Sequence, residues 1–397
     1  EIQLLLQKQS TTRSTENDHG VGDEVKVCGV VPLSELAVDV SDLLSACLNV
    51  PHNRLDLLTS RRDKGIMKDA VASSGLRVAS HIRISSVNEL EALCTTENNE
   101  RTHEGQEEYE SLFSFPVVVK TPLGFSTTDV FICSTFAEAA AALNQICGVA
   151  SSENDTPRPG PDGRAVQEVI LEEYIDGTEF AINLMVLSSE MVVTDIWKYH
   201  KNKQARYNMA EICDPTDPVM KYVVQYAKAV AEAVGILCGA AHVEVKARKK
   251  HNAEGTNILA YRDPVMIEVG ARLSGGRKAS MTQSVVKDWN PFSNLILSHC
   301  GEDTVERPIS FKPQAFVRHL FLPIEQSGLV QSIDIDTTNV TTLHSMIFLV
   351  KVGDIVTETS DITSCAGFVW LIGEEDAVKQ DTERIFSSFV IHVLPLS

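Results

Sequence analysis

Two short stretches decide how this sequence is read, because each carries ionisable residues on a strand that is otherwise apolar. They are Ala241-His242-Val243-Glu244-Val245-Lys246 and Val265-Met266-Ile267-Glu268-Val269-Gly270-Ala271-Arg272. Alternate residues of a strand share a face, so the first strand presents His242, Glu244 and Lys246 together. The second presents Glu268 and Arg272 in the same way and keeps its other face apolar. Neighbouring strands of this kind can bring two carboxylates and a guanidinium into one cleft.

Two carboxylates on adjacent strands suit a magnesium ion, which takes a few carboxylate oxygens and completes its shell with phosphate oxygens and water. The alternative is a solvated sheet face with a Glu–Arg ion pair, and the two strands alone leave both interpretations open. Other residues favour the cleft. Lys120 ends the apolar strand 115–120 and precedes a polar loop, 121–129, that can fold over phosphates, while Glu172, Glu173 and Glu179 surround the turn at 176–177.

The composition is that of a globular protein of several domains. The chain has 397 residues, of which 43% are hydrophobic, and domains run to roughly 100–200 residues each. Its net charge of −19 argues against nucleic acid or an anionic membrane as the partner, since both require clustered Lys and Arg. Nine scattered cysteines without a C-x-x-C pair favour a reducing compartment. We therefore expect a cytoplasmic protein that binds neither nucleic acid nor membrane.

Hydrophobic spacing predicts an α+β fold rather than alternating βαβ units. Helices are expected over 33–48, 63–74 and 217–235, the last capped by Asp217 and ended by Gly235. The predicted strands are 24–31, 115–120, 166–175, 180–187, 241–247, 265–269, 315–322, 346–352 and 368–372. Strands 166–175 and 180–187 are expected to pair through a tight turn at Asp176-Gly177. Polar composition predicts surface loops over 95–111, 151–164 and 248–262.

Taken in order, these motifs resemble the ATP-grasp superfamily, and most of all its carboxylate–amine ligase branch, which includes the L-amino acid (dipeptide) ligases. The resemblance extends from about Glu35 to the end of the chain. It is carried by residues 61–68, 115–120, 171–179, 195–199, 242–246 and 267–276.

The resemblance implies an ATP-grasp fold, in which two α+β lobes grip ATP, with a strand-rich domain after it. We expect a partial N-terminal domain over 1–60, since the segment before residue 25 does not resemble the unit that opens such proteins. The ATP-grasp core is expected over 61–304, with lobes of about 61–165 and 166–304. A C-terminal α+β domain is expected over 305–397.

The same resemblance implies how ATP is held. Two lysines reach its phosphates, an acid lies near the adenine beside backbone groups that contact the ring, and a further acid binds the ribose hydroxyls. In that order the implied residues are Lys64 and Lys120, then Glu172 with Glu173 and Ile175, then Glu179. The segment 197–206 resembles a mobile loop that covers the nucleotide.

The remaining cleft residues take the chemical roles. Glu244 and Glu268 match the ligands of magnesium, for which manganese can stand in. Arg272 matches the arginine that holds the γ-phosphate and acyl-phosphate oxygens. His242 and the turn 274–276 border the acceptor site, where His242 is a candidate base for the amine.

These roles predict an ATP-dependent ligase that joins a small-molecule carboxylate, an amino acid, to an amine through an acyl phosphate and releases ADP and phosphate. A homodimer is the expected assembly. One alternative is another ATP-grasp ligase, of the carboxylase or nucleotide-synthesis type. The other is a nucleotide-binding pseudoenzyme, because Gly270 stands where many relatives have Asn and Gly124 is the single glycine of the loop 124–129.

Overall fold

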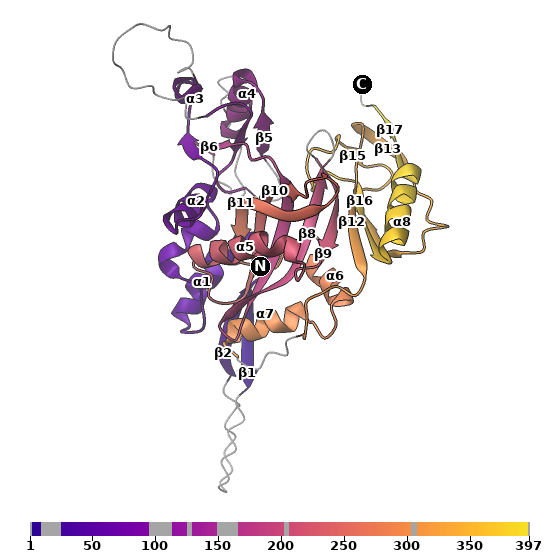
Figure 1. Ribbon diagram of the computed structural model, residues 1–397. Helices are drawn as coiled ribbons and strands as arrows, with labels where there is room; N and C mark the ends of the chain where they lie inside the picture. The colour runs from indigo at the N-terminus through magenta and orange to yellow at the C-terminus, as the bar shows by residue number, and fades with distance from the viewer. Residues whose placement is uncertain are drawn as a thin grey trace, which may run out of the picture.

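The computed structural model describes residues 2–8, 25–94, 113–124, 129–148, 166–201, 206–302 and 308–395, and the structural statements below concern these residues. Two sheets carry the site. The larger has eight strands in the order β11-β10-β7-β8-β9-β12-β16-β14, and the smaller has four in the order β3-β6-β4-β5 (Figure 1). All the strand pairs within these two sheets are antiparallel.

The eight-stranded sheet is covered on both faces. Its first five strands are β11 (Ile258–Gly270), β10 (Ala240–His251), β7 (Thr178–Leu187), β8 (Glu190–Lys201) and β9 (Tyr207–Cys213). Helix α5 (Lys221–Ala233) packs on one face of this part of the sheet, and α6 (Lys278–Val285) and α7 (Pro291–Cys300) pack on the other. The sheet is therefore held rigidly at its centre.

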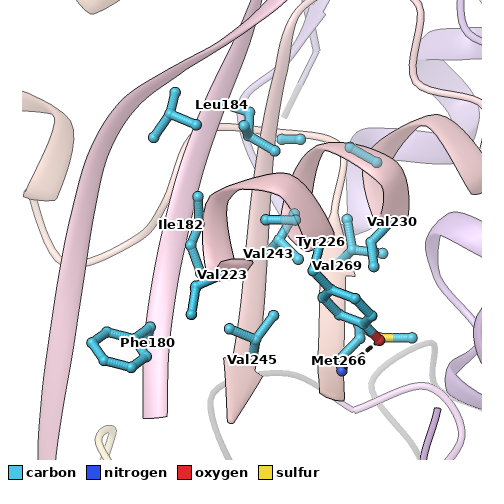
Figure 2. Close-up of a cluster of buried hydrophobic side chains, with 14 of the residues drawn as sticks. Phe180, Ile182, Leu184, Val223, Tyr226, Val230, Val243, Val245, Met266 and Val269 are labelled. Carbon is cyan, nitrogen blue, oxygen red and sulfur yellow. Dashed lines mark hydrogen bonds between the residues drawn. The ribbon is translucent and has the colours of Figure 1, made fainter. Parts of the chain in front are cut away.

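The core under α5 explains the polar face predicted for β10. Figure 2 shows Val243 and Val245 pointing towards the helix, where they meet Val223 and Val230. Burying these side chains contributes roughly 1.5–3 kcal/mol each. Because strand residues alternate, His242, Glu244 and Lys246 must then face away from this core. The face assignment made from the sequence is confirmed.

The four-stranded sheet forms a separate layer with its own core. It consists of β3 (His81–Ile84), β6 (Val169–Glu173), β4 (Val117–Lys120) and β5 (Val130–Cys133). Helices α3 (Val87–Cys94) and α4 (Phe136–Cys147) cover it. Helix α2 (Lys64–Ser73) lies between the two sheets, capped by Asp63, which accepts from Gly65 N and Ile66 N.

The predicted pairing of the strands around Asp176-Gly177 is wrong. β6 pairs with β3 and β4, whereas β7 pairs with β8 and β10. The chain crosses between sheets at Gly177, where φ is +147° and an added Cβ would lie 2.8 Å from the Ala247 oxygen. A local turn signal thus marks a crossover between two sheets instead of a hairpin.

Other sequence expectations have mixed outcomes. The helix predicted over 217–235 is present as a short 3₁₀ turn (Pro218–Met220) followed by α5, with Asp217 accepting from Val219 N. The surface loop predicted over 248–262 is wrong, because β10 and β11 run through most of it and only residues 252–257 form the turn. That hairpin tip is polar since it projects beyond the core. The predicted loops 95–111 and 151–164 lie entirely outside the described residues.

The chain ends extend this framework. β1 (Ile2–Lys8) pairs with β2 (Val25–Pro32), which leads through a 3₁₀ turn at Glu35–Ala37 into α1 (Val38–Cys47). After residue 308, β12 (Phe316–Leu322), β16 (Gly367–Gly373) and β14 (Leu343–Phe348) continue the large sheet. A small sheet of β15 (Ile355–Val356), β13 (Gly328–Asp334) and β17 (Val390–Leu394) packs with α8 (Glu375–Ser388). In the described part of the chain no helix has the length and apolar character needed to cross a bilayer.

Candidate active site

A pocket opens between the four-stranded sheet and the polar face of β10 and β11. Its walls come from the ends of β4 and β6, the start of β7, and helix α2. The ionisable residues that line it include Lys64, Lys120, Glu172, Glu179, Glu244 and Glu268. Ile175, Val118, Val130, Ile132 and Ile267 supply apolar surface. The structure therefore brings together these residues, which the sequence places far apart.

Glu172 is held in a closed ion cluster. Its Oε2 lies 2.7 Å from Lys120 Nζ and 3.1 Å from Lys68 Nζ, and all three side chains are buried. Burial alone would raise the pKa of Glu172, but the two ammonium groups hold it below its usual value. Burial lowers the pKa of Lys68 to about 7, although Glu172 opposes this shift. The carboxylate is thus already neutralised by the protein.

Lys68 is a site residue that sequence reasoning missed. It lies four residues after Lys64, on the same face of α2, where its ammonium is buried against Glu172, a residue of the pocket lining. The i, i+4 spacing within the segment 61–68 was the available signal. Besides Glu172, its ammonium donates to the Ile267 carbonyl at 3.3 Å, which ties α2 to β11.

The backbone after β6 is fixed by neighbouring side chains. Lys246 donates to the Ile175 carbonyl at 2.9 Å and lies over the Tyr174 ring, 4.7 Å from its centroid. Burial lowers the pKa of Lys246. Glu173 accepts from Ser80 N through its side chain at 3.2 Å and is half-exposed. These contacts hold the crossover strand at the pocket edge.

Glu179 is bound by the β8–β9 hairpin. Its Oε2 lies 2.8 Å from Lys201 Nζ, and its Oε1 accepts from the Tyr207 hydroxyl. Burial first, and then the neighbouring Glu179 charge, raises the Tyr207 pKa well above its usual value, so the hydroxyl stays a donor. The covering loop expected over 197–206 is wrong for residues 197–201, which belong to β8, and residues 202–205 lie outside the described residues.

Glu244 and Glu268 face each other across the β10–β11 pair, where they are register partners. Lys64 Nζ lies 3.1 Å from Glu268 Oε2 and also donates to the Gly124 carbonyl. Burial works against the charge of Glu268, yet Lys64 holds its pKa down at about 2. Within the described residues, the ion-pair partner of Glu244 is His242, whose Nε2 lies 3.2 Å from Glu244 Oε1.

This donor set fits magnesium. Among the described residues no cluster of three or more acidic, histidine or cysteine side chains could enclose a metal by itself. Mg²⁺ is usually bound by one or two carboxylates and completes its coordination shell with water and phosphate oxygens. Two facing carboxylates at the edge of this pocket match that preference. Glu244 and Glu268 are therefore the residues that could hold it.

His242 is oriented by a buried hydrogen-bond chain. Its Nδ1 lies 2.8 Å from Asn183 Oδ1, and the Asn183 amide donates to Asp195. Trp197 Nε1 also donates to Asp195, at 2.7 Å. The ring therefore directs Nε2 towards Glu244. Asn183 had not been identified from the sequence, because its role depends on the β7–β10 pairing.

Arg272 lies at the end of the same polar face and is paired with a residue from the N-terminal segment. Its Nε donates to Glu35 Oε2 at 2.5 Å, and its Nη1 donates to the Leu273 carbonyl at 2.9 Å. Glu35 fills the space beside Gly270, where an added Cβ would lie 3.1 Å from Oε2. No sequence signal could have found Glu35, since it is 237 residues away from Arg272.

Comparisons with known proteins agree with this geometry. A family model described as an ATP-grasp domain matches residues 113–261. Dapdiamide A synthase from Enterobacter agglomerans is 24% identical over 358 residues, which cover 88% of this chain and 76% of that protein.

Solved structures have the same fold. The L-amino acid ligase from Bacillus licheniformis superposes with a TM-score of 0.69 at 18% identity, covering 93% of this chain and 82% of the ligase. Phosphoribosylglycinamide synthetase from Anaerococcus prevotii gives a TM-score of 0.57 at 16% identity, covering 91% of this chain and 81% of the synthetase. Residues 113–261 therefore match an ATP-grasp domain, and the chain has the fold of the L-amino acid ligase.

Proposed function

We propose that the protein is an ATP-dependent ligase that joins the carboxylate of an amino acid to an amine and releases ADP and phosphate. One observation carries this proposal: Glu244 and Glu268 face each other in a pocket that Lys64 and Lys120 also line. Paired carboxylates beside two ammonium groups suit a metal-bound triphosphate. The similarity to dapdiamide A synthase and to an L-amino acid ligase supports the amide-forming reaction.

The nucleotide would lie along the pocket. Lys64 and Lys120 would hold its phosphates, while Glu179 would accept from the ribose hydroxyls. Glu172, neutralised by two lysines, would bracket the adenine end together with the backbone of Glu173 and Ile175. Magnesium, held by Glu244 and Glu268, would neutralise phosphate charge when bound.

The chemistry then needs positioning more than covalent help from the protein. A carboxylate oxygen of the amino acid attacks the γ-phosphorus in line, the bond to the β-phosphate oxygen breaks, and ADP leaves. Arg272 would hold the oxygens of the resulting acyl phosphate. The amine nitrogen attacks the acyl carbon, phosphate leaves, and the amine loses a proton. His242 Nε2, fixed by the Asn183–Asp195 chain, is positioned to receive that proton.

A direct assay tests this function. The protein is incubated with ATP, Mg²⁺ and pooled amino acids, and ADP, phosphate and new masses are measured. With amino acids labelled by ¹⁸O in the carboxylate, we expect one ¹⁸O in the released phosphate, because the carboxylate oxygen attacks phosphorus. Release of AMP and pyrophosphate would exclude the acyl-phosphate route.

Two control arms separate the alternatives. ADP release that depends on bicarbonate, with no amide product, would support a carboxylase-type ligase. ATP binding by calorimetry without turnover on any acceptor would support a pseudoenzyme. Glu268→Gln should reduce turnover by about 100-fold, whereas Glu375→Gln, at an exposed position on α8, should not change it.

A further inference from the structure

A second cavity lies beside Arg272, on the side of that residue that faces the N-terminal segment. Its volume is about 460 Å³, within the range of roughly 300–1,000 Å³ that is usual for small-molecule sites. It is bounded by the segment 32–36 after β2, the turn 272–277 after β11, and the beginnings of α6 and α7. Figure 1 shows β2 and α7 beside each other at this end of the molecule. We call it the Arg272 cavity.

One wall of the Arg272 cavity is apolar and open. Leu33, Leu36 and Phe292 line it and are 51%, 50% and 44% exposed. Leu295, at the same wall, is buried and supports them from α7. Large apolar side chains left half-exposed in a concave site provide a surface for an apolar ligand group.

The other end of the cavity carries two opposite charges in contact. Arg272 Nε and Glu35 Oε2 are 2.5 Å apart, and Arg62 Nε lies 3.8 Å from the other oxygen of Glu35. Arg272 and Glu35 each retain 16% exposure of the side chain, so both can be reached from the cavity. An amino acid carries its carboxylate and its ammonium on the same carbon atom. The guanidinium matches the first group and the Glu35 carboxylate matches the second.

Arg272 also links the cavity to the nucleotide pocket electrostatically, because its charge helps to lower the pKa of Glu268, which lines that pocket. Glu268 and Gly270 are alternate residues at the end of β11, and Arg272 follows two residues after the strand ends. A ligand carboxylate held at Arg272 therefore lies next to the phosphate end of the nucleotide pocket. An apolar side chain on the same ligand would extend the other way, towards Phe292.

We propose that the Arg272 cavity binds the amino acid whose carboxylate is activated, and that this amino acid carries an apolar side chain. The proposal rests on the ligase function proposed above and adds the class of the first substrate. Glu35 becomes the residue that recognises its ammonium group, and Leu33, Leu36 and Phe292 become the residues that select its side chain.

The test uses the full chain with ATP, Mg²⁺ and single amino acids at fixed concentration of a second one. Leucine, phenylalanine, alanine, aspartate and lysine are compared with 4-methylpentanoate, which is leucine without the amino group. We expect leucine and phenylalanine to give the highest kcat/KM, and fragment masses to place them at the N-terminal position of the product. Phe292→Ala should raise KM for leucine and phenylalanine by about tenfold and leave alanine within about twofold. The matched control is Leu259→Ala, at an exposed position on β11 outside the cavity lining.

Glu35→Gln tests ammonium recognition, because glutamine keeps an oxygen for Arg272 but removes the charge. The ratio of kcat/KM for leucine to that for 4-methylpentanoate should fall by about tenfold. An unchanged ratio, a preference for aspartate or lysine, or apolar residues only at the C-terminal position would overturn the proposal.

The two proposals can fail separately. If the wild type forms amides but Phe292→Ala matches it on every substrate, only the cavity assignment is lost. If no amide forms with any pair, the ligase function is lost, and calorimetric titration of leucine into the protein with ADP still decides the cavity. Leucine binding that Phe292→Ala weakens would support the site, and absence of heat would reject it.

Discussion

Glu172 and Glu244 are glutamates of one pocket that the protein treats in opposite ways. Glu172 is 2% exposed and has two ammonium groups within 3.1 Å, whereas Glu244 is partly buried and has one imidazole at 3.2 Å as its ion-pair contact. The Glu172 carboxylate is neutralised by these lysines and has a structural role, because its ion pairs join β6 to β4 and α2. A carboxylate without an ammonium partner keeps its oxygens for an added cation. Residue type alone would not separate these two uses.

The largest effect should come from breaking the closed cluster. Glu172→Gln leaves Lys68 and Lys120 buried without a counter-charge, so we expect the free energy of unfolding to fall by about 3–5 kcal/mol. Urea unfolding followed by circular dichroism measures it. The control Glu375→Gln breaks the exposed pair with Lys379 and should cost less than about 1 kcal/mol. Equal losses in the two variants would mean that Glu172 is not a structural ion cluster.

The second-largest effect concerns Glu268, which faces Glu244 across the β10–β11 pair. Glu268→Gln should reduce kcat by about 100-fold, equivalent to about 2.7 kcal/mol, because the metal-bound phosphates lose a carboxylate. Since Lys64 holds the pKa of Glu268 at about 2, its charge stabilises the fold above pH 4.5. That contribution is lost as pH falls from 4.5 towards 2. Between pH 4.5 and 2 the free energy of unfolding of Glu268→Gln should therefore fall less than that of the wild type. Parallel curves of the free energy of unfolding against pH would contradict the Lys64–Glu268 ion pair.

Lys278 is a buried lysine near Glu244 and can be compared with the lysines beside Glu172. It is 5% exposed and, unlike Lys68 and Lys120, has no carboxylate within ion-pair distance in the described structure. Burial lowers its pKa to about 8, although the charges of Glu244 and Asp195 oppose the shift. Between pH 8 and 10.5 the unfolded chain then binds more protons, so stability rises with pH there.

Lys278→Met should remove this rise, which amounts to at most about 1.4 kcal/mol per pH unit. Urea unfolding of the two proteins at pH 7, 8, 9 and 10 checks it. Lys278→Arg keeps a permanent charge and should be less stable than the wild type throughout this range. A constant difference between wild type and Lys278→Met would show that the burial does not disfavour the charge.

The smallest effect is expected at Glu179, whose partners come from the hairpin. Lys201 is partly exposed, and Tyr207 still donates to Glu179 when Lys201 is replaced. Lys201→Met should therefore raise KM for ATP by only about two- to fivefold. Steady-state kinetics at varied ATP measure this, with Tyr207→Phe as the companion variant. A hundredfold increase would mean that the lysine contacts the nucleotide itself.

Periodicity predicted the parts of the site that depend on single strands. The shared face of His242 and Glu244, and that of Glu268 and Arg272, follow from the period of two and from the valines that α5 buries. The predicted pairing across Asp176-Gly177 failed because a glycine turn looks the same whether its strands pair or separate. The pairing depends on partners elsewhere in the fold, which are β3 and β4 for the first strand and β8 and β10 for the second.

Contacts between distant segments could not be predicted in this way. The Glu35–Arg272 pair and the Asn183–His242 bond join residues whose meeting depends on the whole fold. Lys68 is intermediate, because helical spacing places it beside Lys64 while its partner, Glu172, comes from another sheet. Residue roles came from the resemblance, and their distances came from the structure.

The continuation of the large sheet beyond residue 308 affects how the protein can be divided. β12 pairs with β9, and Arg318 donates to Glu211 at 3.0 Å across that junction. A fragment that ends near residue 302 would leave β9 with free backbone N–H and C=O groups and a buried acid without its guanidinium. Such an edge invites pairing with other chains. A shortened chain should therefore aggregate when it is expressed, because β12, β16 and β14 complete the large sheet.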